Sequence, residues 1–285
     1  MADKTTIRGL ERGLRVLQAF QMKPDLSLQD IHAMTAIPKP SLLRVLATLE
    51  SFGLITRRLV DGRYRMSTVA NTNARAPDRY DRVAEVAAPI LRQLCRRVAW
   101  PSELIVPAGD HLEVRESSRA ETPFPIVLVG LRHKVSWLMS AVGRAYLAYC
   151  PSKERQKIFA LLQKSQRPED RLARDPKRFD RILAETRARG FAVRDPSFAG
   201  GPLDGPIAAD GLAAIAVPLR GKGLLHGVIN MTWLQPAYSI DDFAALHLKD
   251  LKGAAAEIVQ ALGRHAARSA MRVSQARDGA ADASD

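Results

Sequence analysis

The sequence predicts an α+β protein with two folded parts joined by a helix. The stretch from Ser27 to Met66 has the pattern of a helix, a tight turn, a second helix and two strands joined by a turn. The later part of the chain alternates short apolar strands with helices and contains two hairpin patterns. The expected divisions are residues 1–75, a linker helix at 76–98, a second domain with an antiparallel sheet at 99–267, and a disordered tail at 268–285.

A first helix is expected over residues 7–22. Leu10, Leu14, Leu17 and Phe20 recur at helical spacing and predict its buried stripe. This helix is expected to support the two that follow, and it is a candidate for a dimer contact.

The second helix is predicted to begin at Ser27, whose side chain suits an N-cap, with Asp30 at the position of a capping box. Leu28, Ile31 and Met34 are expected to form its apolar face. A turn follows at Thr35-Ala36-Ile37, and Pro38 and Pro40 suit the first turn of the next helix, where amide hydrogens have no intrahelical partner.

The third helix has a core face and an opposite polar face, and Gly53 suits its C-terminal cap. The core face is Leu42, Val45, Leu46 and Leu49, and the opposite face is Lys39, Ser41, Leu43, Arg44 and Thr48. Residues 54–58 and 63–66 flank Asp61-Gly62, a strong hairpin signal. This order of elements is that of a winged helix-turn-helix. In that motif the second of the two helices, here the third helix of the chain, enters the DNA major groove.

Charge agrees with that interpretation. Between residues 39 and 65, six basic side chains stand against two acidic ones, and the whole chain carries a net charge of +13 with a pI near 10.2. Such a balance favours a polyanionic partner, although acidic lipid surfaces attract it as well. The alternative is a helical subdomain with a solvated basic face. Since pattern and charge coincide, double-stranded operator DNA is the expected partner.

Individual roles follow from residue chemistry. Arg44 suits bidentate pairing with guanine, and Ser41 suits a phosphate or a base edge. Leu43 suits either a thymine methyl group or the core, and both alternatives stay open. The hairpin arginines, Arg65 included, alternate on their strands, so about half are expected to meet phosphate. The predicted DNA-binding residues are Lys39, Ser41, Leu43, Arg44, Arg57, Arg58 and Arg63.

Elements of the second half follow from the same patterns. A helix is expected over 79–97, then strands at 103–106, 112–115 and 125–129, and helices at 141–150, 152–162 and 176–189. Residues 191–194 form a further strand, residues 212–219 and 224–234 form a hairpin, and a final helix capped by Ser239 reaches about His265.

Several classes are disfavoured. No apolar run has the length of a membrane span, and the first residues lack the apolar core of a signal peptide, so a cytoplasmic location is expected. Cys95 and Cys150 have no metal-ligand spacing, and the histidines are scattered. Nucleotide-binding and nucleophile motifs are absent from the sequence. We therefore expect neither an enzyme nor a cofactor or metal site.

Four segments together resemble the IclR family of transcription regulators. They are RGLERGLRVLQAF, IPKPSLLRVLATLESFGLI, LMSAVGRAYLAYCP, and ARGFAVRD followed by GLAAIAVPLRGKGLLHGVINM. The stretch RRVAWPSELIVPAGDHLEVRESSR is similar to activators of phenylpropionate-type aromatic acid catabolism. The resemblance implies a GAF-like effector domain with a six-stranded sheet, and a homodimer or homotetramer on palindromic DNA. Pro40 departs from the serine or threonine usual in the family, and Pro196-Ser197-Phe198 stand where an acidic residue is common.

An effector pocket needs apolar walls and a few polar groups. Its predicted residues are Trp100, Ser102, Arg115, Phe124, Trp137, Met139, Phe198 and Met231, although most of the apolar ones also suit an ordinary core. A carboxylate would need a cation, for which Arg115, Arg132 and Arg194 are candidates. Arg115 lies in an apolar strand, so pairing with Glu103 or Glu113 is the alternative.

The hypothesis is therefore a transcription regulator whose operator binding is modulated by a small aromatic acid. Two alternatives remain: an architectural DNA binder whose C-terminal domain only oligomerises, and an enzyme acting on an aromatic acid.

Overall fold

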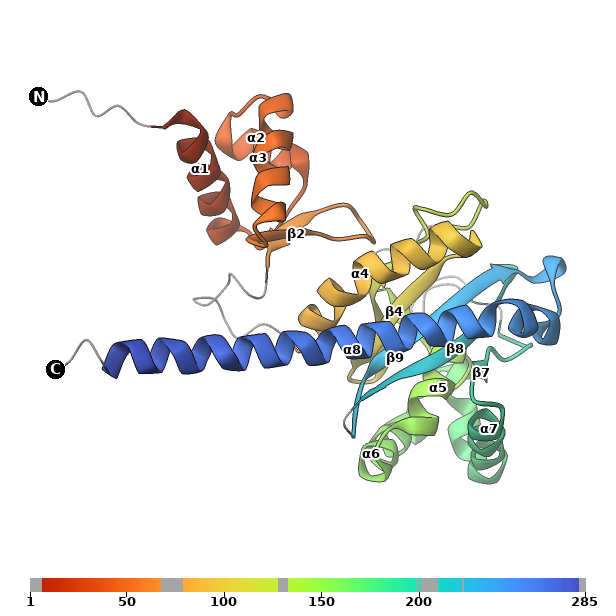
Figure 1. The fold of residues 1–285 in the computed structure, drawn as a ribbon. Helices are drawn as coiled ribbons and strands as arrows, with labels where there is room; N and C mark the ends of the chain where they lie inside the picture. Colours follow the sequence, from red (N-terminus) through yellow and green to blue (C-terminus); the bar gives the residue numbers. More distant parts are fainter. Residues whose placement is uncertain are drawn as a thin grey trace, which may run out of the picture. The chain divides into compact units, whose positions relative to one another are not determined.

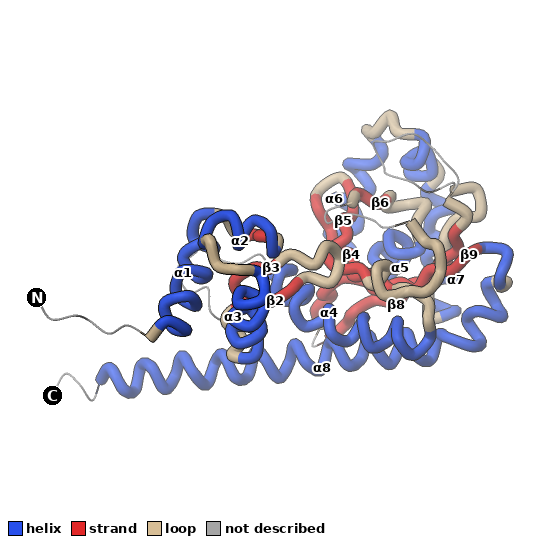
Figure 2. The backbone as a smooth tube through the Cα atoms, turned by 90° about the horizontal axis from the view of Figure 1, so that it is seen from above, coloured by secondary structure: helices blue, strands red, loops and turns tan. Residues whose placement is uncertain are grey.

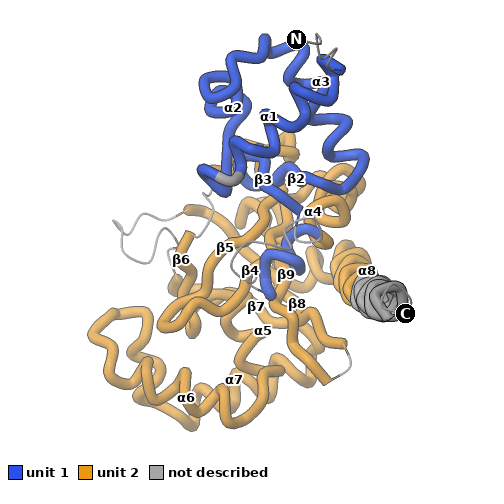
Figure 3. Tube along the Cα trace, turned by 90° about the vertical axis from the view of Figure 1, so that its left-hand side faces the viewer, with its two compact units in different colours: residues 1–85 blue, residues 86–285 orange. Residues whose placement is uncertain are grey.

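The computed structural model describes residues 7–67, 79–127, 133–198, 200, 210–221 and 223–281 (Figure 1). The chain divides into a N-terminal unit, residues 1–85, and a C-terminal unit, residues 86–285 (Figure 3). Among the helices of the described ranges, none has the length and apolar character needed to cross a bilayer.

The N-terminal unit contains the three predicted helices and the predicted hairpin, to which a short third strand adds. Its elements are α1 (Arg8–Met22), β1 (Asp25–Leu26), α2 (Leu28–Thr35), α3 (Lys39–Ser51), β2 (Ile55–Arg57) and β3 (Tyr64–Met66). The sheet has the order β1-β3-β2, and Arg57 pairs with Tyr64 across the predicted Asp61-Gly62 turn, where Gly62 has φ +67°. The core joins side chains from α1, α2, α3 and the sheet, including Val16, Ile31, Leu42 and Leu46.

The buried faces of α1 and α2 differ from the predicted ones. Leu10 and Leu14 are 59% and 51% exposed, and the buried face of α1 is Val16, Ala19 and Phe20. Met34 is also exposed, because α2 buries Ile31 and Thr35 instead. An apolar stripe predicts that a helix has a preferred face, but the neighbouring helices decide which residues it covers.

The C-terminal unit has a six-stranded antiparallel sheet with helices on both faces, which confirms the predicted fold class (Figure 2). Its elements are α4 (Arg79–Val98, which begins in the N-terminal unit), β4 (Ser102–Ala108), β5 (His111–Ser117), β6 (Lys134–Val135), α5 (Ala141–Tyr149), α6 (Ser152–Gln163), η1 (Pro168–Arg174), α7 (Pro176–Arg189), β7 (Ala192–Val193), β8 (Leu212–Gly221), β9 (Leu224–Leu234), η2 (Gln235–Ala237) and α8 (Ile240–Ala281). The strand order is β6-β5-β4-β9-β8-β7.

Most of these elements match their predicted ranges, with two differences. Residues 125–127 form no strand, residues 128–132 lie outside the described part of the chain, and the edge strand is β6. Helix α8 extends to Ala281, beyond the end near His265 that the sequence predicted. This segment is rich in Ala and contains no Pro, and that composition supports helix. Of the predicted linker helix, residues 76–78 lie outside the described residues, and residues 79–98 form α4.

Candidate functional site

The start of α3 is fixed by the elements before it. Ser27 Oγ accepts a hydrogen bond from the Asp30 amide at 3.0 Å, and the Asp30 carboxylate accepts from the Ser27 amide at 2.9 Å, which confirms the capping box. These hydrogen bonds from Ser27 lower the pKa of Asp30. Ala36 ends α2 in the left-handed conformation, with φ +55°, and turns the chain into Pro38 and α3. Local sequence therefore sets the angle at which α3 leaves the motif.

One face of α3 is open to solvent. Lys39, Leu43 and Arg44 are exposed and Ser41 is half-buried, whereas Leu42 and Leu46 on the other side are fully buried. Leu43 is 48% exposed, so it does not belong to the core. In the described part of the chain neither Lys39 nor Arg44 forms an ion pair. The face thus offers two cations, a hydroxyl and an apolar side chain in one patch.

Arg58 does not belong to this surface. Its side chain is 5% exposed and pairs with Asp25 at 3.0 Å and with Asp61 at 2.5 Å. Its charge is satisfied inside the unit, where it ties β1 to the turn between β2 and β3. The prediction that Arg58 contacts DNA was therefore wrong, because alternation along a strand does not reveal which arginine has carboxylate partners.

The other hairpin arginines differ in whether a carboxylate pairs with them. Arg63 pairs with Asp30 at 3.2 Å, and Arg65 pairs with Asp81 at 3.1 Å and is 13% exposed. Arg57 is exposed; it donates to the Gly62 carbonyl at 3.1 Å and lies over the Tyr64 ring. Within the described residues it has no carboxylate partner. Of the six cations between residues 39 and 65, those without a carboxylate partner among the described residues are Lys39 and Arg44 on α3 and Arg57 on β2.

The two faces of the large sheet can be assigned from one contact. The Trp233 ring of β9 stacks on Phe243 of α8 with centroids 3.8 Å apart. Since neighbouring side chains of a strand point to opposite faces, Thr232 and Asn230 face the other way, toward α5. The register then places Glu103 of β4 beside Asn230 on the α5 side, and Ser102 beside Met231 on the α8 side.

This assignment separates the predicted effector residues. Trp100 stacks on Phe124 at 4.1 Å and meets Phe243 of α8 at 6.0 Å, and Met231 is fully buried on the same side of the sheet. Ser102 is also fully buried there, and its hydroxyl has no hydrogen-bond partner among the described residues. Trp100, Ser102 and Met231 thus belong to the core between the sheet and α8, and the half-buried Phe124 packs on Trp100. These four residues do not line a pocket together with the other predicted effector residues.

Trp137, Met139 and Phe198 lie on the α5 side. The Trp137 ring meets Tyr146 of α5 edge-on at 5.5 Å, and the Met139 carbonyl accepts from the Asp195 amide. The Phe198 ring lies 4.9 Å from the Arg194 guanidinium. The buried Arg144 guanidinium pairs with Asp195 and donates to the Leu138 carbonyl, which joins α5 to the segments on either side of it.

The predicted effector cations are paired. Arg115 is buried and pairs with Glu113 at 2.7 Å, which is one of the two partners considered from the sequence. Arg194 pairs with Asp210 at 2.9 Å, and Arg132 lies outside the described residues. Neither of the two described arginines is poised for a carboxylate.

A buried polar cluster on the α5 side was not predicted from the sequence. Asn230 Nδ2 donates to Glu103 Oε2 at 2.8 Å, and its Oδ1 accepts from the Glu103 amide at 2.8 Å. Arg119 pairs with the other Glu103 oxygen at 2.8 Å. Burial lowers the pKa of His133, despite the attraction of Glu103. The available signal was the polar residues Asn230 and Thr232 in the otherwise apolar strand VINMTWL.

Two further polar atoms on that side have no partner in the described part of the chain. They are Trp137 Nε1 and Thr232 Oγ1, in side chains that are 1% and 4% exposed. Buried polar groups are usually hydrogen-bonded, so a pair of unsatisfied ones suggests a ligand or water. The Cys150 thiol is buried, which raises its pKa to about 11, and no group of metal-ligating side chains occurs within the described ranges.

Comparison with known proteins gives consistent matches. Residues 9–59 match the IclR helix-turn-helix domain. The chain is 27% identical over 154 residues to the transcriptional regulator KipR of Bacillus subtilis, covering 53% of this chain but only 58% of KipR. It is 25% identical to the regulator BhcR of Paracoccus denitrificans, covering 76% of this chain and 74% of BhcR. An IclR homolog from Microbacterium sp. strain HM58-2 shares the fold, with a TM-score of 0.50, 21% identity, and coverage of 90% and 98% of the two chains.

Proposed function

We propose that this transcriptional regulator, whose N-terminal domain is an IclR-type helix-turn-helix domain, reads operator DNA with α3 and Arg57 and responds to a small aromatic acid. The observation that carries the DNA-binding half is a set of exposed cations, Lys39, Arg44 and Arg57, that have no carboxylate partner among the described residues. Arg44 would recognise a guanine, Leu43 a thymine methyl group, and Lys39, Ser41 and Arg57 the phosphates. Arg63 is a weaker candidate because Asp30 already neutralises it.

The effector half rests on the α5 side of the sheet. Trp137 Nε1 and Thr232 Oγ1 are hydrogen-bond donors without partners in the described residues, and both would suit a carboxylate. Trp137 and Tyr146 would supply aromatic walls, with Met139 and Phe198 at the edge. Binding would alter the operator affinity only if the acid prefers one arrangement of the protein.

A homodimer or homotetramer on a palindromic operator is part of the same proposal. Ile7, Leu10 and Leu14 follow one face of α1 and are 73%, 59% and 51% exposed. Exposed apolar side chains in a row support a subunit contact. Sedimentation equilibrium of the Leu14→Glu variant tests it: a smaller assembly than the wild type supports the contact, and an unchanged assembly refutes it.

The DNA-binding half is tested by selecting a duplex from a random library and measuring its affinity by fluorescence anisotropy. We expect the Lys39→Gln/Arg44→Gln variant to lose sequence preference. Lys249→Gln, an exposed lysine of α8, is the control for a lost positive charge. Equal loss of binding in the control variant would refute the assignment of α3.

The effector half is tested on the same duplex with benzoate, phenylacetate and 3-phenylpropionate. One of them should change the affinity for DNA, and Thr232→Val should abolish that response while leaving DNA binding intact. Sequence-specific binding that no acid alters would favour an architectural DNA binder instead.

A further inference from the structure

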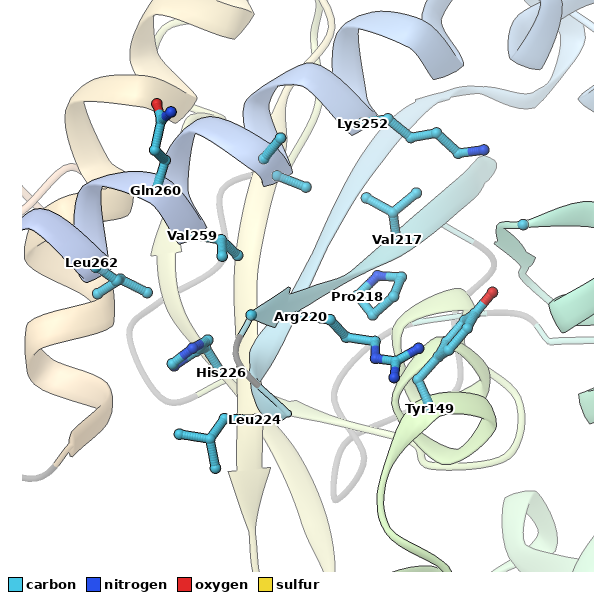
Figure 4. A pocket seen from close by; sticks show the side chains of 15 residues that line it. Tyr149, Val217, Pro218, Arg220, Leu224, His226, Lys252, Val259, Gln260 and Leu262 are labelled. Atoms are coloured by element: carbon cyan, nitrogen blue, oxygen red, sulfur yellow. The ribbon is translucent and has the colours of Figure 1, made fainter.

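A separate cavity of about 830 Å³ lies in the C-terminal unit between α8, the β8–β9 hairpin and the end of α5 (Figure 4). This volume is within the range of small-molecule sites, roughly 300–1,000 Å³. None of the residues of the α5-side polar cluster lines it. It is therefore a different place from the effector site proposed above.

The pairing of β8 explains why the cavity is open. In the described part of the chain, β7 pairs with Ile215 and Ala216 of β8, and β8 continues from Val217 to Gly221 without a further strand beside it. At the end of this edge an added Cβ on Gly221 would lie 2.4 Å from Val259 Cγ1 of α8. Gly221 thus lets the strand approach the helix closely and closes the floor of the cavity.

The lining is apolar with positive charge at one end. Figure 4 shows Lys252 and Tyr149 at one end, and Val259, Leu262 and Leu224 toward the other. The Arg220 guanidinium lies 5.5 Å from the Tyr149 ring, and Lys252 Nζ lies beside Gly190. The fifteen lining residues include no Asp or Glu, and neither Arg220 nor Lys252 forms an ion pair within the described part of the chain.

We propose that this cavity binds an organic anion with an extended apolar tail, such as a medium-chain carboxylate. The carboxylate would pair with Arg220 and Lys252, which come from different elements and share no counter-ion. The tail would follow α8 from Lys252 to Val259, a rise of roughly 10 Å at 1.5 Å per residue. That distance matches an eight-carbon chain, whereas benzoate is too short to use both ends.

The alternative role for these residues is protection of the strand edge. Charged side chains and proline on an edge discourage pairing with other chains, and Arg220 and Pro218 fit that description as well. Edge protection needs neither Lys252 nor an apolar cavity beside the edge. Ligand binding therefore distinguishes the two roles, and it does so whether or not the proposed DNA and effector functions hold.

The test is calorimetric titration of the full-length protein with octanoate, and with octan-1-ol as its neutral match. We expect one saturable octanoate site per chain and affinity for octan-1-ol lower by about tenfold, the effect of losing a charge-assisted contact. The Arg220→Gln/Lys252→Gln variant should have an affinity for octanoate that is lower by a similar factor. Ala256→Trp should abolish binding, because Ala256 is an exposed α8 residue whose side chain borders the cavity.

Two controls locate the site. Lys249→Gln removes a charge from α8 outside the cavity and should leave octanoate affinity unchanged, and so should Thr232→Val on the α5 side. Circular dichroism confirms that each variant is folded. Absence of saturable binding, or equal affinity in the Arg220→Gln/Lys252→Gln variant, would refute the proposal. Loss of octanoate binding in Thr232→Val would refute it too, since octanoate would then occupy the other site.

Discussion

Arg57 and Arg58 are adjacent residues of one hairpin, and the structure predicts opposite consequences for their replacement. Arg58 is 5% exposed and holds two carboxylates, Asp25 at 3.0 Å and Asp61 at 2.5 Å. Arg57 is exposed and has only a backbone carbonyl and a ring as neighbours among the described residues. Arg58→Met should therefore affect the stability of the N-terminal unit, and Arg57→Gln should affect DNA binding.

The magnitudes follow from burial and from counterion release. Breaking a fully buried ion pair costs about 3–5 kcal/mol, but Asp25 and Asp61 are 40% and 26% exposed and regain water. We therefore expect Arg58→Met to lower the opening free energy of the β2–β3 amides by about 1–3 kcal/mol. Arg57→Gln should leave that free energy unchanged. It should reduce the slope of log affinity against log salt by about 0.9, the value for one phosphate contact.

Hydrogen exchange of the full-length protein measures the first quantity, and titration of a random 30-base-pair duplex at several salt concentrations measures the second. A random duplex suffices because the phosphate term does not depend on sequence. Arg58→Met should leave the salt slope as in the wild type. If it reduces the slope as Arg57→Gln does and leaves the exchange unchanged, the division of the hairpin into a structural and a DNA-facing arginine is wrong.

Four further substitutions test packing, helix capping and a buried carboxylate, each by thermal denaturation. Gly143→Ala should lower the free energy of unfolding by about 1–3 kcal/mol or more, the effect of overpacking, because the added Cβ would lie 2.0 Å from the Trp137 carbonyl oxygen. Gly253 is a helical glycine with open space around it, so Gly253→Ala should raise the free energy of unfolding by about 0.5–1 kcal/mol. Ser27→Ala should cost about 1 kcal/mol through loss of the N-cap, and no loss would contradict the capping box. Burial raises the pKa of Asp170, so its ionised form destabilises the fold: Asp170→Asn should be more stable than the wild type at pH 7, and the difference should shrink as the pH falls through the raised pKa.

The helix-turn-helix was predictable from sequence because its signals are local. Ser27 and Asp30 cap one helix, and Gly53, with φ +68°, ends the next, and each acts through neighbours within a few residues. The third helix also has one clear apolar face. Such signals fix the order and the bounds of elements, and the α+β class follows from their sum.

Which face of a helix or strand is buried was less predictable, because burial depends on contacts between segments that are distant in the sequence. Leu10 and Leu14 follow the helical period as well as Val16 does, yet only Val16 meets the other helices. In the large sheet, Trp100 and Trp137 looked alike in sequence, and the register of β4 against β9 was needed to place them on different sides. Similarly, α8 extends beyond its predicted end, because polar residues after His265 indicated a chain end although their helix propensity is adequate.

The pairing of charged side chains also depends on contacts between distant residues. Six basic side chains between residues 39 and 65 supported a DNA-binding surface, but the structure assigns Arg58, Arg63 and Arg65 to carboxylates of the same unit. An ion pair already formed has little to gain from phosphate, since its counter-ion is in place and its side chain is held. The electrostatic attraction for DNA should then come from the remaining cations, Lys39, Arg44 and Arg57. A net charge counts ion-paired and unpaired cations equally. The number of unpaired cations, rather than the number of all cations, should therefore set the salt dependence of DNA binding.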